Sequence, residues 1–333
     1  MAPDRRRRPR ACRRWSRRGP PVGHPVSSTS TVVPTGTGRR QPAAGPHAGR
    51  GPVWRRRLGP VALYLPAVAL VALVSVFPIA YALRLSVYRT RALRVVEFIG
   101  WDNFTTVLGP AGWADIARTF VYVVVSLVLA VPLGLGLAVL LNKQVRFVRM
   151  FRVVILLPWV VSQTVAALLW KWLLNGQYGP LHSLFGGDGP LSSPWGSMAS
   201  LIVVNVWLSY PLATILCLAA LQTVPAEQIE ASRVDGCNPR QSFFLVVVPA
   251  IRSTLLILVI MLTLLYFNMV TLVYTLTGGG PFSGTQVLSL NAFLQSFQFF
   301  KIGIGAAYSV VLFVFNIVFG VAYIRVLKGK NDA

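Results

Sequence analysis

Acidic residues are scarce in this sequence: only nine of its 333 residues are Asp or Glu, against 32 Lys or Arg. Charged residues of both signs make up 12%, whereas hydrophobic residues make up 54% and the mean hydropathy is +0.61. A soluble domain of this length needs more charge than that to cover its surface. The composition therefore argues against a soluble protein and indicates that lipid forms part of its solvent.

Ligands for a metal and groups for a catalytic centre are equally few. The three histidines and three cysteines are scattered without the spacing of a metal site. His182, in a predicted external loop, is expected to be solvated. The glycines at 278–280 are not followed by Gly-Lys-Ser/Thr, so the phosphate-binding loop of ATPases is missing. We expect no metal, no cofactor and no enzymatic activity in this chain by itself.

Residues 1–57 are rich in Arg, Pro, Gly, Ser and Thr and lack apolar periodicity. We predict a disordered basic tail, or a start codon assigned too far upstream, followed by a transmembrane domain over 58–330. Arg-rich tails can bind nucleic acid, but nothing else in the chain suits that role. We therefore predict no nucleic-acid partner.

Six apolar segments follow the tail. At 1.5 Å per residue, about 20 residues cross a hydrocarbon core of roughly 30 Å. Lipid cannot satisfy backbone polar groups, so each segment must be a helix. The predicted fold class is an all-α membrane protein with six transmembrane helices and a further external helix around Gln286–Phe300. The segments are approximately 61–83, 119–141, 153–174, 199–221, 253–276 and 303–327.

Lys and Arg residues set the expected orientation. The tail and the regions 142–152, 222–252 and 325–330 carry most of them, and the loops on the opposite side carry seven. The positive-inside rule therefore places both termini in the cytoplasm of a multi-pass plasma-membrane protein. One cluster in the first external loop opposes this orientation but is outnumbered. Its members are Arg84, Arg89, Arg91 and Arg94.

Polar side chains within the segments are candidates for a substrate path, because they are costly in lipid and usually face a cavity or a neighbouring helix. Amides bind hydroxyl groups, and aromatic rings stack on the C–H faces of sugars. The alternative for each residue is a hydrogen bond between helices. Asn268, in the middle of the fifth segment, is the first choice. The others are Gln163, Asn205 and Tyr266.

The long loop between the fourth and fifth segments predicts two short helices separated by a break. Pro225 suits a first helical turn, and Gly236 tolerates the positive φ of a chain reversal. Pro239 suits the start of a second helix, and Pro249 marks the bend into the fifth segment. Two helices at an angle on the cytoplasmic face would form a rigid projection that can fit a cleft on a soluble partner.

This loop resembles the EAA motif of ABC importer permeases, which reads E-A-A, three residues, G, nine residues, I-x-L-P. The residues that match it in type or position are Glu230, Ala231, Ser232, Gly236 and Pro249. The sequence departs from the motif at three positions, with Ser232 for Ala, Val246 for Ile and Val248 for Leu. The resemblance implies that this segment is the coupling helix, which docks on the ATP-hydrolysing subunit.

Two further stretches narrow the resemblance to sugar permeases. Residues 98–104, Phe-Ile-Gly-Trp-Asp-Asn-Phe, look like the F-x-G-L-x-N-F stretch of their first external loop. Residues 276–281, Leu-Thr-Gly-Gly-Gly-Pro, are similar to a stretch typical of the first permease subunit in glycerol-3-phosphate and maltose-type systems. The resemblance covers about residues 60–327.

The resemblance implies a translocation subunit for a sugar, an oligosaccharide or a related polyol or glycerol-phosphate compound, with ATP used by partner subunits. The implied partners are a second permease, two cytoplasmic ATP-binding subunits and an extracytoplasmic solute-binding lipoprotein, with lipid around the membrane domain. The alternative is a secondary transporter driven by an ion gradient, which usually carries ionised residues in mid-span and inverted repeats. We expect all nine acids in loops or tails and find no repeat, which favours the importer.

Overall fold

The computed structural model describes residues 53–91, 94–143, 148–181 and 189–328. Helices dominate these ranges, so the predicted all-α membrane class is confirmed, with one small β-hairpin added. The elements in chain order are α1 (Val53–Ser86), β1 (Tyr88–Arg91), β2 (Arg94–Phe98), α2 (Asp102–Val107), α3 (Pro110–Asn142), α4 (Val148–Val160), α5 (Gln163–Leu173), η2 (Pro190–Ser192), α7 (Pro194–Gln222), α8 (Ala226–Val234), α9 (Pro239–Ser242), η3 (Phe243–Val247), α10 (Val248–Ala250), α11 (Arg252–Phe267), α12 (Thr271–Leu276), α13 (Leu288–Phe293), η4 (Leu294–Gln298) and α14 (Ile302–Lys328).

Four helices of the described ranges are long and apolar enough to cross a membrane: Tyr64–Ser86 of α1, α3, α7 and Ile302–Val326 of α14. Two bent helix pairs, α4 with α5 and 239–250 with α11, raise the number to as many as six. The first helix begins at Val53, five residues before the predicted start of the transmembrane domain at 58. The rest of the predicted tail lies outside the described residues, as does His182.

The third predicted segment is not a single helix. α4 and α5 meet at 94°, and the break falls at residues 161–162. Ser162 has extended backbone angles (φ −57°, ψ 137°) and stands immediately before α5. Pro158 lies inside α4 and removes a backbone donor one turn before the break. The prediction of one continuous helix over 153–174 is therefore wrong.

The fifth predicted segment is also interrupted. α11 ends at Phe267 and α12 begins at Thr271. The Nδ2 atom of Asn268 donates to the backbone oxygen of Leu264, 2.7 Å away and one turn back on the same helix. Such local side-chain bonds compete with the helical backbone pattern. Asn268 therefore lies at a helix break, and the prediction that places it in the middle of a continuous span is wrong.

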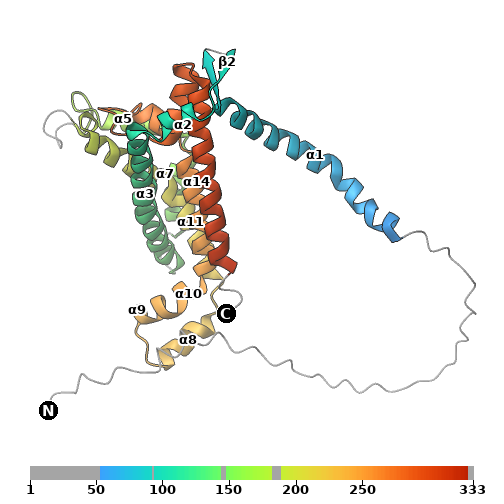
Figure 1. The fold of residues 1–333 in the computed structure, drawn as a ribbon. Helices are drawn as coiled ribbons and strands as arrows, with labels where there is room; N and C mark the ends of the chain where they lie inside the picture. The colour runs from blue at the N-terminus through green and yellow to red at the C-terminus, as the bar shows by residue number, and fades with distance from the viewer. Residues whose placement is uncertain (1–52, 92–93, 144–147, 182–188, 329–333) are drawn as a thin grey trace, which may run out of the picture. The chain divides into compact units, whose positions relative to one another are not determined.

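The chain from Ala80 onward forms one compact unit, and the described part of the chain before it forms another. Within the later unit, α3, α7, α11 and α14 run side by side (Figure 1), with the hairpin at one end and α8 and α9 at the other. α3 approaches α7 closely at Gly134, where an added Cβ would lie 2.5 Å from the Cβ of Ala213. Ala130 and Ala138 are buried at four-residue spacing on either side of Gly134. This small-residue stripe lets the two helices pack tightly in a membrane.

The stretch 98–104 joins the end of α1 to the start of α14. Gly100 has a φ of +57°, a value that suits glycine. The Nδ2 atom of buried Asn103 donates to the backbone oxygens of Ser86 and Tyr88, at 2.8 and 3.0 Å. Gly303 lies against the same backbone, because an added Cβ there would be 2.3 Å from the oxygen of Tyr88. Residues 98–104, one of the two stretches that resemble sugar permeases, therefore have a structural role: they hold the end of α1 against the start of α14.

The expectation that every acid lies in a loop or tail is wrong for Asp115. This residue lies in the second turn of α3 and is buried, because α3 begins at Pro110, well before the predicted start of the segment at 119. Its carboxylate accepts hydrogen bonds from Arg118 at 2.8 Å, Asn291 at 2.6 Å and Tyr308 at 3.3 Å. The acid is therefore ion-paired, and it links α3 to α13 and α14.

Candidate functional site

The two helix breaks line one cavity of about 530 Å³. Gln163, the first residue of α5, contributes to one wall, and Asn268 and Thr271 at the junction of α11 and α12 contribute to another. Most of the remaining lining is apolar and comes from α7 and α11. An apolar cavity with a few polar groups is the usual form of a small-molecule site. Interrupted helices at membrane depth are tolerated where they line such a cavity.

Two amides, together with Thr271, contribute hydrogen-bonding groups to this cavity. Asn268 is exposed and donates from Nδ2 to Leu264 and, at 3.3 Å, to Oδ1 of Asn316 on α14. Within the described chain, no hydrogen bond to its Oδ1 atom is present, so this acceptor is left for a ligand. Gln163 is half-buried at the start of α5. Amides of this kind can bind the hydroxyl groups of a neutral solute.

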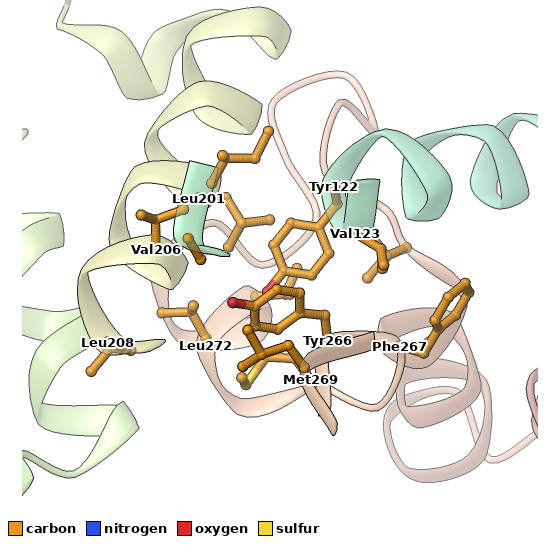
Figure 2. Packing of buried hydrophobic residues seen from close by; sticks show 14 of the residues in the cluster. Tyr122, Val123, Leu201, Val206, Leu208, Tyr266, Phe267, Met269 and Leu272 are labelled. Atoms are coloured by element: carbon orange, nitrogen blue, oxygen red, sulfur yellow. The ribbon is translucent and has the colours of Figure 1, made fainter. Parts of the chain in front are cut away.

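Asn205 and Tyr266 lie in the packed core instead. Tyr266 is 1% exposed and donates from its hydroxyl to Oγ of Ser209, 2.6 Å away on α7. Figure 2 shows its ring beside that of Tyr122 from α3, with the ring centroids 6.2 Å apart. Asn205 is fully buried, and neither side-chain polar atom has a partner among the described residues. The structure brings Gln163 and Asn268 to the cavity and does not bring Asn205 or Tyr266 there.

Thr271 is the polar cavity residue that the sequence hypothesis missed. It is the first residue of α12, three residues after Asn268. The Asn-Met-Val-Thr run, with polar residues at both ends inside an apolar segment, is a signal that could have identified it. The signal was missed because the segment was taken as one helix.

The loop after α7 has the two short helices predicted for it. α8 ends before Gly236, whose φ is +82°. Asn238 then caps α9 through a reciprocal capping box with Gln241. Pro225 precedes the first residue of α8 as its N-cap, one position before the predicted first turn. At Ile251 the chain bends by 68° into α11, so the predicted bend is present two residues after Pro249.

A buried hydrogen bond holds α8 and α9 together. The Oγ atoms of Ser232 and Ser242 lie 2.7 Å apart, and both side chains are buried. The hydroxyl of Ser232 also donates to the backbone oxygen of Ile229, 2.7 Å away on the same helix. Ser232 is one of the three positions at which the sequence departs from the EAA motif. An alanine there could not make this bond, so the departure contributes to the angle between the helices.

The outer surface of α8 combines a carboxylate with apolar side chains. Glu230 and Ala231 are exposed, and Glu230 forms no ion pair within the part of the chain that the structure describes, including with Arg233. Val234 is 88% exposed on the same helix, and Phe244 is 66% exposed just after α9. Exposed apolar groups beside an unpaired charge are typical of a surface that meets a partner.

Comparison with known proteins places this chain among transport permeases. Residues 130–328 match the family described as the binding-protein-dependent transport system inner membrane component. The chain is 28% identical to the sulfoquinovosyl glycerol transport system permease protein SmoG of Agrobacterium fabrum, over 84% of this chain and 96% of SmoG. It is 30% identical to the trehalose transport system permease protein SugA of Mycobacterium tuberculosis, over 75% of this chain and 82% of SugA.

A solved structure has a similar fold. The crystal structure of a bacterial ABC transporter involved in the import of the acidic polysaccharide alginate contains a chain that aligns with a TM-score of 0.67. The alignment covers 81% of this chain and 96% of that one, at 19% sequence identity. The likeness shows that most of this chain shares the fold of that transporter chain.

Proposed function

Because this chain belongs to the binding-protein-dependent transport system inner membrane component family, we propose that it forms the translocation path of an ATP-driven sugar importer. The proposed solute is a sugar, an oligosaccharide or a related polyol or glycerol-phosphate compound. The observation that carries this choice is the cavity with two uncharged amides, Gln163 and Asn268, at the meeting of two broken helices. The names of the relatives support it, because SmoG and SugA are named for a sugar-containing glycerol compound and for trehalose.

The helix α11 connects the proposed coupling loop to the cavity. It starts immediately after the bend at Ile251 and ends immediately before Asn268, with 16 residues between. At 1.5 Å per residue this is a rod of roughly 24 Å. A displacement of α8 and α9 by a partner would move this rod and open or close the cavity wall at Asn268. This connection supports the proposal that alternating access is driven from the loop.

We assign the loop 225–249 and both termini to the cytoplasm, on the distribution of Lys and Arg. The proposed partners are a second permease of similar fold, two cytoplasmic ATP-binding subunits and an extracytoplasmic solute-binding lipoprotein. The unpaired Glu230 and the exposed Val234 support a docking partner at the loop. An ion-driven mechanism has less support, because Asp115, the acid found within a candidate span of the described ranges, is ion-paired to Arg118 at 2.8 Å.

The purified chain alone is expected to hydrolyse ATP at background rate, because its sequence has no phosphate-binding loop. Hydrolysis should appear on adding the cognate ATP-binding subunit and should rise again on adding the solute-binding protein with its solute. The measurement is phosphate release by the chain alone, by the ATP-binding subunit alone and by the reconstituted set. Rapid hydrolysis by the single chain would contradict the proposed division of labour.

Replacing Asn268 with leucine is expected to raise the KM of solute uptake, or lower its rate, by about 2- to 10-fold, the effect of one lost hydrogen bond. Binding of the ATP-hydrolysing subunit should be unchanged. Asn205→Leu is the matched control, since it is the same substitution in the packed core and should leave uptake kinetics unaltered. Equal uptake by wild type and Asn268→Leu would assign Asn268 to helix packing through Asn316 alone.

A further inference from the structure

A second cavity, of about 450 Å³, lies where the β1–β2 hairpin and α2 meet the start of α14. Three cations line it, Arg89, Arg91 and Lys301, together with one carboxylate, Asp102. Arg89 is partly neutralised, because its guanidinium nitrogens lie 3.1 Å from Glu97 and 3.7 Å from Asp102. Arg91 and Lys301 form no ion pair with any acid in the described ranges. The cavity therefore carries uncompensated positive charge.

The register of the hairpin adds to this charge. Arg91 lies directly opposite Arg94 at the end of the ladder, and both side chains are exposed. Like charges in directly opposed positions destabilise a strand pair. The folded hairpin keeps these charges together, and an anion bound beside Arg91 would relieve their repulsion.

The cavity lies at the level where two candidate membrane spans end. α1 ends at Ser86, and α14 begins immediately after Lys301. Phe299 and Phe300 line the cavity, and Trp101 next to it is 74% exposed. Aromatic side chains at the ends of spans are typical of the zone of lipid headgroups. Arg89 and Arg91 of the cavity belong to the arginine cluster that opposes the predicted orientation. The positive-inside rule therefore does not explain their presence.

We propose that this cavity binds the phosphate of an anionic phospholipid headgroup, with Arg91 and Lys301 as its principal ligands. A guanidinium can hold a phosphate through two parallel hydrogen bonds, and an ammonium holds it as a point charge. The hydroxyl of Thr106, exposed on the cavity wall, can donate to a further oxygen. A concave site of this volume suits a headgroup, whereas a protein partner would need a surface on the order of 1,000 Å².

In the test, the purified full-length protein and the subunits that co-purify with it are kept in detergent. This sample is titrated with phosphatidylglycerol or with phosphatidylcholine. Thermal stabilisation gives the apparent Kd for each lipid. Arg91→Gln and Lys301→Gln should each weaken phosphatidylglycerol binding about fivefold, and the double variant roughly thirtyfold. Lys171→Gln is the matched control, since it removes an exposed cation from α5, which does not line the cavity. It should change the affinity by less than about twofold.

Three outcomes would overturn the proposal. The first is equal phosphatidylglycerol affinity in the wild type and the double variant. The second is binding of glycerol 3-phosphate as tight as that of phosphatidylglycerol, which would make the site one for a soluble anion. The third is a double variant that keeps its lipid affinity but loses stimulation by the solute-binding protein, which would assign the surface to a protein partner.

Discussion

Replacing Glu230 with alanine is expected to weaken assembly with the ATP-hydrolysing subunit by roughly thirtyfold or more and to abolish coupled uptake. Glu230 is exposed on α8 and unpaired within the described chain, so its loss should hardly affect folding or membrane insertion. If the carboxylate becomes buried against a cation of the partner, removing it leaves that cation unpaired, which costs about 2–5 kcal/mol. Because 1.4 kcal/mol corresponds to a tenfold change, a cost of about 2 kcal/mol or more raises the dissociation constant by roughly thirtyfold or more.

Glu227→Ala provides a control on the same helix. Glu227 is also an exposed carboxylate, and it lies in the first turn of α8, outside the EAA-like motif. Its replacement should lose only the interaction with the helix N-terminus, about 0.3–1 kcal/mol. The measurement is co-purification of the ATP-hydrolysing subunit alongside solute uptake. If Glu230→Ala assembles and transports as well as Glu227→Ala does, the loop is not the coupling element.

The geometry of this loop was accessible from sequence because its signals are local. Gly236 takes the positive φ that its residue type suggests, and Pro239 begins α9 as its residue type suggests. The bond between Ser232 and Ser242 was not accessible, because it depends on how α8 and α9 cross in space. Residue types therefore predicted the two helices and the break between them, but not the contact that fixes their angle.

The cavity was harder to predict because hydropathy hides helix breaks. A segment with a break at Ser162 or Asn268 is as apolar, on average, as a continuous one, since only a few residues differ. Gln163 and Asn268 were identified by polarity alone. The helix break that brings each of them to the cavity was not predicted. Polarity identified Asn205 and Tyr266 equally, yet both face the core. Which face of a helix is buried depends on packing partners that one sequence does not specify.

Replacing Asp115 with leucine is expected to lower the free energy of unfolding by about 3–5 kcal/mol, the effect of breaking one side of a buried ion pair. The leucine leaves Arg118 without its carboxylate, and it leaves the amide of buried Asn291 without the acceptor now 2.6 Å away. The Arg118 side chain is 29% exposed and can regain some hydration, which places the effect toward the lower end of the range. The measurement is the equilibrium unfolding of purified protein in detergent.

Glu97→Leu is the matched control for this change. It breaks the ion pair with Arg89, whose side chain is 50% exposed and whose partner Glu97 is 59% exposed. Such surface pairs contribute about 0–1 kcal/mol, so the loss should be correspondingly small. The double variant Asp115→Leu, Arg118→Leu should recover part of the loss, because it removes the stranded guanidinium. If Asp115→Leu unfolds at the same denaturant concentration as Glu97→Leu, the carboxylate does not hold α3 to α13 and α14, and the links to Asn291 and Tyr308 contribute no stability.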